Sequence, residues 1–210
     1  MFNTSISSSQ NQPLLKEKDL YSKLSTYLHS ELNIYSHRIN EKRSANKRGR
    51  NGNKWLYPDI VGVEDLSTDW NREIKDCVRE YFNKKTKLTS YEVKTFINPV
   101  NVREVFFQAV SNSSWANLGY LVTTEIQGKN TIKELTILCN LHGIGVIELN
   151  IDDPLESYIK IPAKERQEID WDTANRLAKE NTDFRNYIEQ ICHFYKTGHS
   201  KYLKPNIQSE

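Results

Sequence analysis

Cysteine is scarce in this chain, and the three cysteines that it has lie far apart. Cys77, Cys139 and Cys192 show no paired spacing, which argues against both a zinc site and a disulfide framework. Isolated thiols of this kind are typical of a reducing compartment. We therefore expect a cytoplasmic protein with free cysteines.

Long apolar stretches are also missing. No run approaches the roughly 18 residues that a membrane span needs, and no signal peptide is visible, so we expect a soluble protein without a membrane partner. Hydrophobic residues make up only 37% of the chain, whereas aromatic residues, at 10%, are plentiful. With 210 residues the chain is long enough for one domain with a proper core.

Several signatures of common enzyme classes are absent as well. The sequence has no internal repeat, no glycine-rich phosphate-binding loop and no serine–histidine grouping, and its five histidines are scattered. Acidic and basic side chains are therefore the main candidates for chemistry.

Positive charge is concentrated in one stretch. The whole chain carries a net charge of only +2, but residues 38–54 contain seven lysines and arginines against one glutamate. Glycines and asparagines in this stretch predict a loop. Cations on a flexible backbone suit phosphate groups, which need charge more than strict geometry, although such a run can also be a solvated surface. The candidate nucleic-acid-binding residues are Arg38, Lys42, Arg43, Lys47, Arg48, Arg50 and Lys54.

The first predicted element is a helix that begins near Leu15. It follows residues 1–12, whose serine, asparagine and glutamine content predicts a disordered lead-in. At 100° per residue, an apolar stripe runs from Leu20 to Tyr35. Glu31 falls in the middle of that stripe, where an unpaired carboxylate would be costly. We expect Glu31 to pair with an arginine or lysine in the core, to sit at a half-exposed end, or to reach toward a metal at the sheet edge.

Alternating strands and helices are predicted for the rest of the chain. The strands are expected at 57–63, 88–97, 120–125 and 144–149, and the helices at 69–83, from Asn101, from Thr131 and at 163–197. Glu104 is expected to cap the helix at Asn101, and a break near Asn181 divides the last helical region. The tail at 199–210 is expected to be loose. This order of elements predicts an α/β sandwich with a mixed sheet.

Three ionisable side chains are expected to converge at one edge of that sheet. Side chains alternate between the faces of a strand, so Glu92 and Lys94 point the same way. If the strand that carries Asp59 pairs alongside, a second carboxylate joins them. Two carboxylates and a lysine can hold a divalent cation on a phosphodiester, with the lysine orienting the attacking water. A simple ion pair within or between strands is the alternative.

The triplet Glu92-Val93-Lys94 is weak evidence when taken alone. With 27 acidic residues and 19 lysines in 210 positions, about two acid-x-Lys triplets are expected by chance, and the chain has two. The other triplet, Glu73-Ile74-Lys75, lies in the predicted helix at 69–83, where its charges would form a solvated face. The strand context therefore distinguishes the first triplet from the second.

Pro58-Asp59 followed by Glu92-Val93-Lys94 resembles the PD-(D/E)xK nuclease superfamily. Other stretches resemble one branch of it, the HrgA-like proteins found beside restriction–modification genes. These stretches are Tyr35–Ile39, Asn53–Asp59 and Phe106–Asn117. The likeness spans about Leu14 to Gly198, nearly the whole chain.

This resemblance implies both a fold and a mechanism. The fold would be a restriction-endonuclease-like three-layer sandwich, a single domain over 13–198 with a C-terminal helical extension at 163–197. Asp59 and Glu92 would ligate Mg²⁺, for which Mn²⁺ can substitute, and Lys94 would activate water to leave a 5′-phosphate and a 3′-hydroxyl. Glu31 and Gln108 are further catalytic candidates, because the superfamily often places polar side chains on the flanking helices.

The predicted function is a metal-dependent endodeoxyribonuclease that acts on DNA in restriction or phage defence. The rival prediction is a non-catalytic nucleic-acid-binding or partner-binding module that keeps the nuclease fold. RNA as the substrate, a homodimer and a partner protein from a restriction–modification locus stay open. If Asp59 and Glu92 converge they should repel, so Asp59→Ala is expected to melt higher than the wild type without metal.

Overall fold

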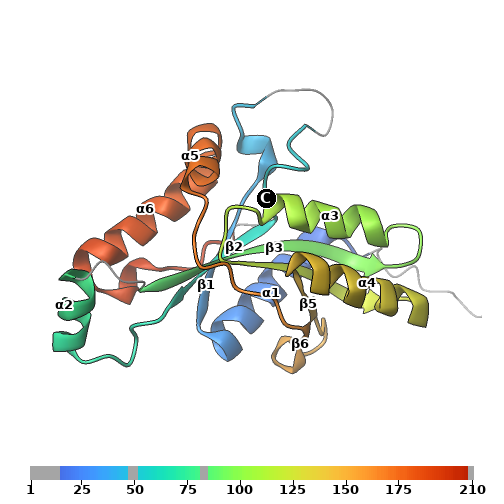
Figure 1. The fold of residues 1–210 in the computed structure, drawn as a ribbon, viewed down its shortest axis with the longest axis horizontal. Helices are drawn as coiled ribbons and strands as arrows, with labels where there is room; N and C mark the ends of the chain where they lie inside the picture. The colour runs from blue at the N-terminus through green and yellow to red at the C-terminus, as the bar shows by residue number, and fades with distance from the viewer. Residues whose placement is uncertain (1–14, 47–51, 81–84, 208–210) are drawn as a thin grey trace, which may run out of the picture.

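Within the part of the chain that the structure describes, six strands form one mixed sheet in the order in which they occur along the sequence, from β1 to β6 (Figure 1). The computed structural model describes residues 15–46, 52–80 and 85–207. The strands are β1 Ile34–Arg38, β2 Ile60–Asp65, β3 Thr86–Ile97, β4 Leu118–Ile126, β5 Gly145–Glu148 and β6 Tyr158–Ile161. The α-helices are α1 Glu17–Leu32, α2 Arg72–Glu80, α3 Val102–Asn112, α4 Lys129–His142, α5 Trp171–Glu180 and α6 Thr182–Thr197.

The connections explain which strand pairs are parallel. Strands β1, β2 and β3 pair antiparallel, β3 with β4 and β4 with β5 pair parallel, and β6 returns antiparallel to β5. Parallel neighbours need a long crossover connection, and α3 and α4 provide the two crossovers. The prediction of an α/β fold with a mixed sheet is confirmed.

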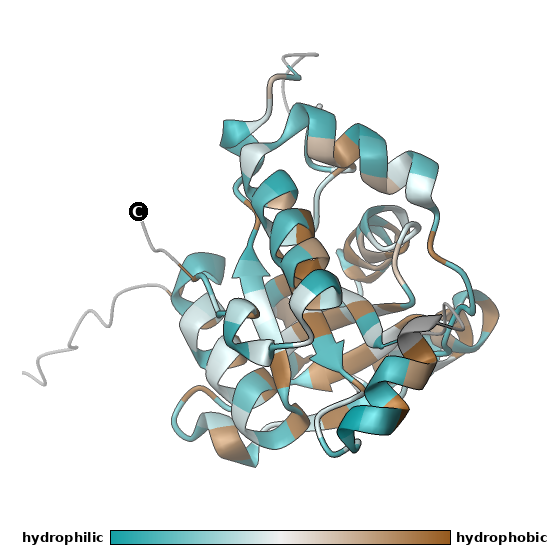
Figure 2. Cartoon of the chain, turned by 90° about the vertical axis from the view of Figure 1, so that its left-hand side faces the viewer, coloured by the Kyte–Doolittle hydropathy of each residue, from teal (hydrophilic) through white to brown (hydrophobic). Residues whose placement is uncertain are grey.

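Helices cover both faces of the sheet. On one face, α1 packs against Tyr91 and Val93 of β3. On the other face, α3 and α4 pack against Leu121 and Val146 of the central strands. Figure 1 shows α1 and α3 on opposite sides of β3, and Figure 2 shows apolar strands enclosed by helices with largely polar outer faces. This arrangement is compatible with a three-layer sandwich. Among the described helices, none has both the length and the apolarity to cross a membrane.

The two C-terminal helices close a third part of the core, over β2 and the start of β3. Trp115 meets the ring of Phe184 edge to face, with 4.9 Å between the ring centroids. The hydroxyl of Tyr187 donates to the carbonyl of Gly62 at 2.8 Å. The predicted break at Asn181 is confirmed, because its side chain accepts from the backbone N–H groups of Asp183 and Phe184 and so starts α6.

Two predicted helices are shorter than expected. Tyr35 lies in β1 rather than on the helical stripe, because Asn33 takes a left-handed conformation (φ 52°) that ends α1. Helix α5 begins only at Trp171, where the Asp170 side chain accepts from the backbone of Thr173. Residues 163–170 are therefore not helical, contrary to the prediction.

Helix α2 forms, but two members of its expected apolar face are not buried: Ile74 is 50% exposed and Cys77 is exposed. Val78 is half-buried, and Tyr81 and Phe82 lie outside the described residues. The helix begins at Arg72 rather than at 69.

The predicted loose tail is also wrong as far as Ile207. Leu203 is only 1% exposed and belongs to the core beneath α6. Asn206 then pairs with β1, where its backbone accepts from Arg38 N–H and donates to the Ser36 carbonyl, both at 2.9 Å. The predicted lead-in at 1–12 lies outside the described residues.

Candidate active site

The candidate site lies where β3 extends beyond the end of its antiparallel partner, β2. Strand β2 pairs with β3 only as far as Ile60 opposite Tyr91, so one edge of β3 is open from Glu92 onward. Asp59 lies in the bend just before β2, so the prediction that it lies within a strand is wrong. Its carboxylate accepts from the backbone N–H of Val93 at 2.9 Å. A side chain thus takes the place of a strand partner, which fixes Asp59 against β3.

Glu92 and Lys94 share the same small space, as expected from strand alternation. The Lys94 Nζ lies 2.8 Å from Glu92 Oε1, and Glu92 is only 2% exposed. Asp59, Glu92 and Lys94 line one cavity of about 680 Å³. The structure therefore brings the three predicted residues together.

The helix-borne acid at this cavity is Glu17, not Glu31. Glu17 Oε1 lies 3.3 Å from Lys94 Nζ. Glu31 is exposed near the other end of α1, and 14 helical residues at 1.5 Å each place it roughly 21 Å farther along the axis. The prediction of a catalytic Glu31 is therefore wrong in its geometry. An acid at the first turn of α1 reaches the open edge of β3 instead.

Helix α3 supplies two buried amide side chains. Gln108, a predicted site residue, lines the cavity and donates to the Lys54 carbonyl at 3.1 Å. Asn112, one turn later, donates to the same carbonyl and to Glu92 Oε2 at 2.8 Å. The amide oxygens of both side chains are buried and find no donor among the described residues. Asn112 was not predicted as a site residue. The pattern that could have indicated it is a second amide, four residues after Gln108, on the apolar face of the same helix.

Asp59 has further partners on the side of α1. The Tyr21 hydroxyl donates to Asp59 Oδ1 at 2.9 Å, and the Arg38 guanidinium lies 3.3 Å from the same oxygen. Arg38 also lies over the ring of Tyr21, 4.3 Å from its centroid. These contacts oppose the repulsion from Glu92 on which the predicted gain in stability of Asp59→Ala depends. Glu104, predicted to cap α3, instead pairs with Lys54 at 2.6 Å.

Burial and charge shift the protonation equilibria of this cluster. Burial, together with repulsion from Asp59, raises the pKa of Glu92 from 4.5 to about 8. Burial likewise raises the pKa of Glu17, against the lowering effect of Lys94. Burial alone would lower the pKa of Lys94, but Glu92, Asp59 and Glu17 together raise it. The cluster therefore keeps Lys94 charged, and the Glu92 carboxyl holds its proton more tightly than a solvent-exposed carboxyl does.

The predicted cationic residues fall into three groups. Arg38, Lys42 and Lys54 line the cavity, and Lys42 is exposed. Arg43 lies in a neighbouring pocket, paired with Asp183 at 2.6 Å. The remaining three, Lys47, Arg48 and Arg50, lie outside the described residues. The described part of this stretch thus borders the site, but three of its four described cations, Arg38, Arg43 and Lys54, are already paired with acids.

The donor set suits a hard divalent cation. Among the described residues, no three acidic, histidine or cysteine side chains gather closely enough to hold a metal by themselves. Mg²⁺ commonly takes only one or two carboxylates and completes its shell with water and phosphate oxygens. Asp59 and Glu92 provide two such carboxylates. The buried oxygen of Gln108, which lacks a donor, is the kind of neutral ligand or water acceptor that fits beside them.

The second acid-x-Lys triplet lies on α2 and does not contribute to this cavity. Glu73 is exposed, and the half-buried Lys75 lies 3.5 Å from the Thr68 carbonyl. This triplet is a solvated helix face, as predicted, and serves as a matched control.

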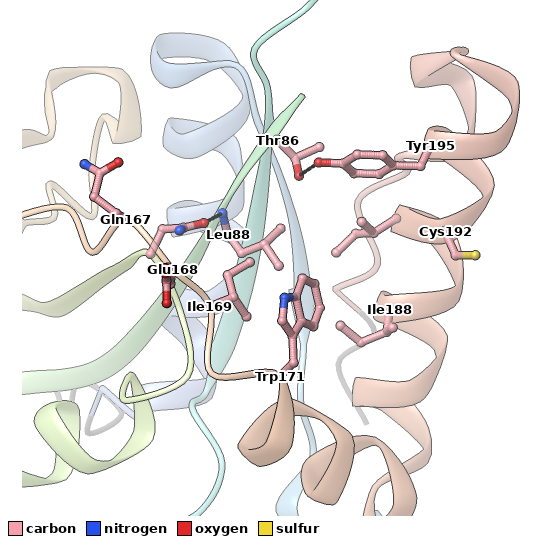
Figure 3. A pocket seen from close by; sticks show the side chains of 11 residues that line it. Thr86, Leu88, Gln167, Glu168, Ile169, Trp171, Ile188, Cys192 and Tyr195 are labelled. Carbon is pink, nitrogen blue, oxygen red and sulfur yellow. Dashed lines mark hydrogen bonds between the residues drawn. The ribbon is translucent and has the colours of Figure 1, made fainter. Parts of the chain in front are cut away.

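A separate cavity of about 630 Å³ lies between α6 and the start of β3 (Figure 3). Figure 3 shows Leu88 and Ile169 on one side and Ile188 on the other, with the ring of the exposed Trp171 between Ile169 and Ile188. Gln167 and Glu168 also line the cavity. Tyr195 reaches across the top to Thr86, and their hydroxyls lie 3.1 Å apart. This apolar cavity lacks the converging carboxylates and lysine of the first one, so charge chemistry favours the Asp59 site.

Comparison of the chain with family models, with curated proteins and with solved structures found no match. The function proposed below therefore depends on the residues of the cavity and on the motif resemblance.

Proposed function

We propose that this protein is a metal-dependent endodeoxyribonuclease with its active site at the open edge of β3. One observation carries the proposal: Asp59, Glu92 and Lys94 converge in a solvent-connected cavity of about 680 Å³. Such a cavity falls within the size range of pockets that bind small substrates and cofactors. The motif resemblance to PD-(D/E)xK nucleases points to the same three residues and to a nuclease-like sandwich fold.

Asp59 and Glu92 would hold the cation, which would supply Lewis acidity and neutralise phosphate charge when bound. The role of Lys94 follows from its two acidic neighbours. If Glu92 turns toward a cation, Glu17 remains 3.3 Å from the Lys94 amine and keeps it in position. Lys94 then orients and polarises the attacking water, while Gln108 offers that water a hydrogen-bond acceptor through its free oxygen.

The substrate that fits best is DNA. Lys42 and Lys54 line the cavity, and further cations belong to the same stretch of sequence. Cations at this position suit contacts with phosphates on either side of the cleaved bond. The resemblance to proteins of restriction–modification loci favours a role in restriction or phage defence, with Mg²⁺ or Mn²⁺ as the cofactor and a cytoplasmic location.

Cleavage assays with matched variants test this proposal. Supercoiled, linear and single-stranded DNA, and single-stranded RNA, would be incubated with the protein in Mg²⁺, Mn²⁺ or EDTA. We expect metal-dependent cleavage of DNA, reduced at least about 100-fold in Asp59→Asn, Glu92→Gln and Lys94→Gln, which is the scale of losing an acid–base or electrostatic group. The controls Glu73→Gln and Lys75→Gln break the α2 triplet and should retain activity.

The rival function is a binding module that keeps the fold without catalysis. The buried Glu92–Lys94 pair, completed by Asn112, is the observation that favours it, because a satisfied ion pair needs no metal. DNA binding without cleavage under any metal condition, unchanged in Glu92→Gln, would favour this rival.

A further inference from the structure

A second pocket adjoins the candidate active site on the other side of a shared wall. It has a volume of about 270 Å³, and Tyr21, Arg38, Glu41 and Lys42 line both cavities. The wall is built from Arg38 lying over Tyr21, and both side chains contact Asp59 on the catalytic side. The second pocket is thus the immediate neighbour of the catalytic carboxylate.

Helix α1 serves the two pockets with adjacent residues. Glu17 and Tyr21, one turn apart, line the catalytic cavity, whereas Lys18, Tyr21 and Ser22 line the second pocket. Consecutive helical residues point about 100° apart. The helix therefore directs an acid toward Lys94 and a lysine toward the neighbouring pocket.

The charges of the second pocket leave two cations without partners. Its acids are engaged: Glu41 lies 3.4 Å from Arg38, and Asp183 lies 2.6 Å from Arg43 and accepts from the Asn40 N–H. Within the described part of the chain, the amines of Lys18 and Lys42 have no hydrogen-bond or ion-pair partner. Both lysines are exposed. The pocket therefore carries positive charge that its own acids do not neutralise.

We propose that this pocket is a phosphate subsite, in which Lys18 and Lys42 bind a phosphodiester group next to the cleaved bond. The inference rests on the proposed function, because the phosphate in this pocket would belong to the same nucleic-acid strand that is cleaved at Asp59. A strand carries one charge for about every 3.4 Å of axial rise, so a strand held at Asp59 brings further phosphates to the adjacent pocket. Lysine suits this task as a flexible point charge.

The subsite has a consequence for the substrate. A strand that ends at the cleaved bond on the α1 side would leave Lys18 and Lys42 without a ligand. Substrates that continue past α1 should therefore bind more tightly than substrates that stop there, at equal length.

Single neutral replacements in the DNA backbone test this assignment. Oligonucleotides with one methylphosphonate at successive positions would be titrated by fluorescence anisotropy against the inactive Glu92→Gln protein. We expect weaker binding when the neutral group occupies one or two positions on one side of the cleaved bond. In Glu92→Gln/Lys18→Gln the same methylphosphonate should cause no additional loss of affinity. In that double variant the slope of log affinity against log salt should also fall in magnitude by about 0.9 on duplex DNA.

The control is Lys133→Gln on α4, which removes the same charge from an exposed lysine that lines neither pocket. An equal loss at every methylphosphonate position in Lys18→Gln, or the same loss in Lys133→Gln, would overturn the subsite. So would inorganic phosphate that saturates the pocket without displacing the oligonucleotide. A position-specific Lys18 effect in a protein that never cleaves DNA would support the subsite and refute the nuclease.

Discussion

At the scale of single residues, Glu92 makes the fold sensitive to pH. Its folded-state pKa of about 8 lies above the ordinary 4.5, so between these values the folded chain keeps a proton that the unfolded chain has released. The free energy of unfolding should therefore fall as pH rises through this window.

Replacing Glu92 by glutamine removes that proton equilibrium. We predict that the stability of Glu92→Gln relative to the wild type rises between about pH 5 and pH 8, by up to about 1.4 kcal/mol per pH unit. Urea unfolding at several pH values measures the difference. Curves for the two proteins that stay parallel across this range would show that Glu92 titrates normally.

The motif residues could be predicted from sequence, and their partners could not. Strand alternation is enough to place Glu92 beside Lys94, because only local geometry is involved. Glu17 contacts Lys94 across 77 residues of sequence, and Asn112 contacts Glu92 across 20. Both contacts depend on how helices pack on the sheet. Glu31 was selected for its place on the apolar stripe, but helical phase says nothing about which end of a helix reaches the site.

At the scale of elements, Asn181 joins the C-terminal helices to the loop that borders the site. It is fully buried, its side-chain oxygen caps α6, and its amide donates to the Asn40 carbonyl at 2.9 Å. One side chain thus satisfies a helix end and a turn that are distant in sequence.

We predict that Asn181→Ala lowers the free energy of unfolding by about 2 kcal/mol, from the lost cap of α6 and the lost hydrogen bond to the Asn40 carbonyl, which keeps its bond from the Arg43 N–H. Thermal or urea unfolding provides the measurement. Asp170→Ala, which removes the solvent-exposed cap of α5, is the matched control and should cost less. Equal losses in both variants would mean that the contact with Asn40 adds nothing.

Elements with a strong period were predicted well, and those set by single residues were not. The strands over 88–97 and 120–125 are present in β3 and β4, and α3 begins next to Asn101 as expected. Strand β1 was missed because its apolar residues also fit the preceding helical stripe, and only the left-handed Asn33 separates them. Short edge strands such as β6, with exposed and half-buried residues, leave no clear alternation to detect.

At the scale of the whole molecule, a bound divalent cation should stabilise the folded state. A ligand that binds only the folded state adds about 2.7 kcal/mol at a hundredfold excess over its Kd. We predict that millimolar Mn²⁺, which binds carboxylates more tightly than Mg²⁺ does, raises Tm by several degrees. The rise should be larger at pH 8.5 than at pH 6, because the proton on Glu92 competes with the cation.

Matched variants identify the origin of the Tm shift. Asp59→Asn and Glu92→Gln should lose the effect of Mn²⁺, whereas Glu73→Gln on α2 should keep it. A Tm shift of the same size in the wild type and in all three variants would place the cation elsewhere on the molecule.

The pairing of Asn206 with β1 also bears on how copies of this chain behave toward one another. A strand at the border of a sheet presents unpaired backbone groups that can template the addition of a neighbour's strand. The bonds from Asn206 to Ser36 and Arg38 occupy those groups at the middle and end of β1. The single bridge at Asn206 should therefore hinder another copy of the chain from pairing with β1. It does so next to Arg38, the β1 residue that also contacts Asp59.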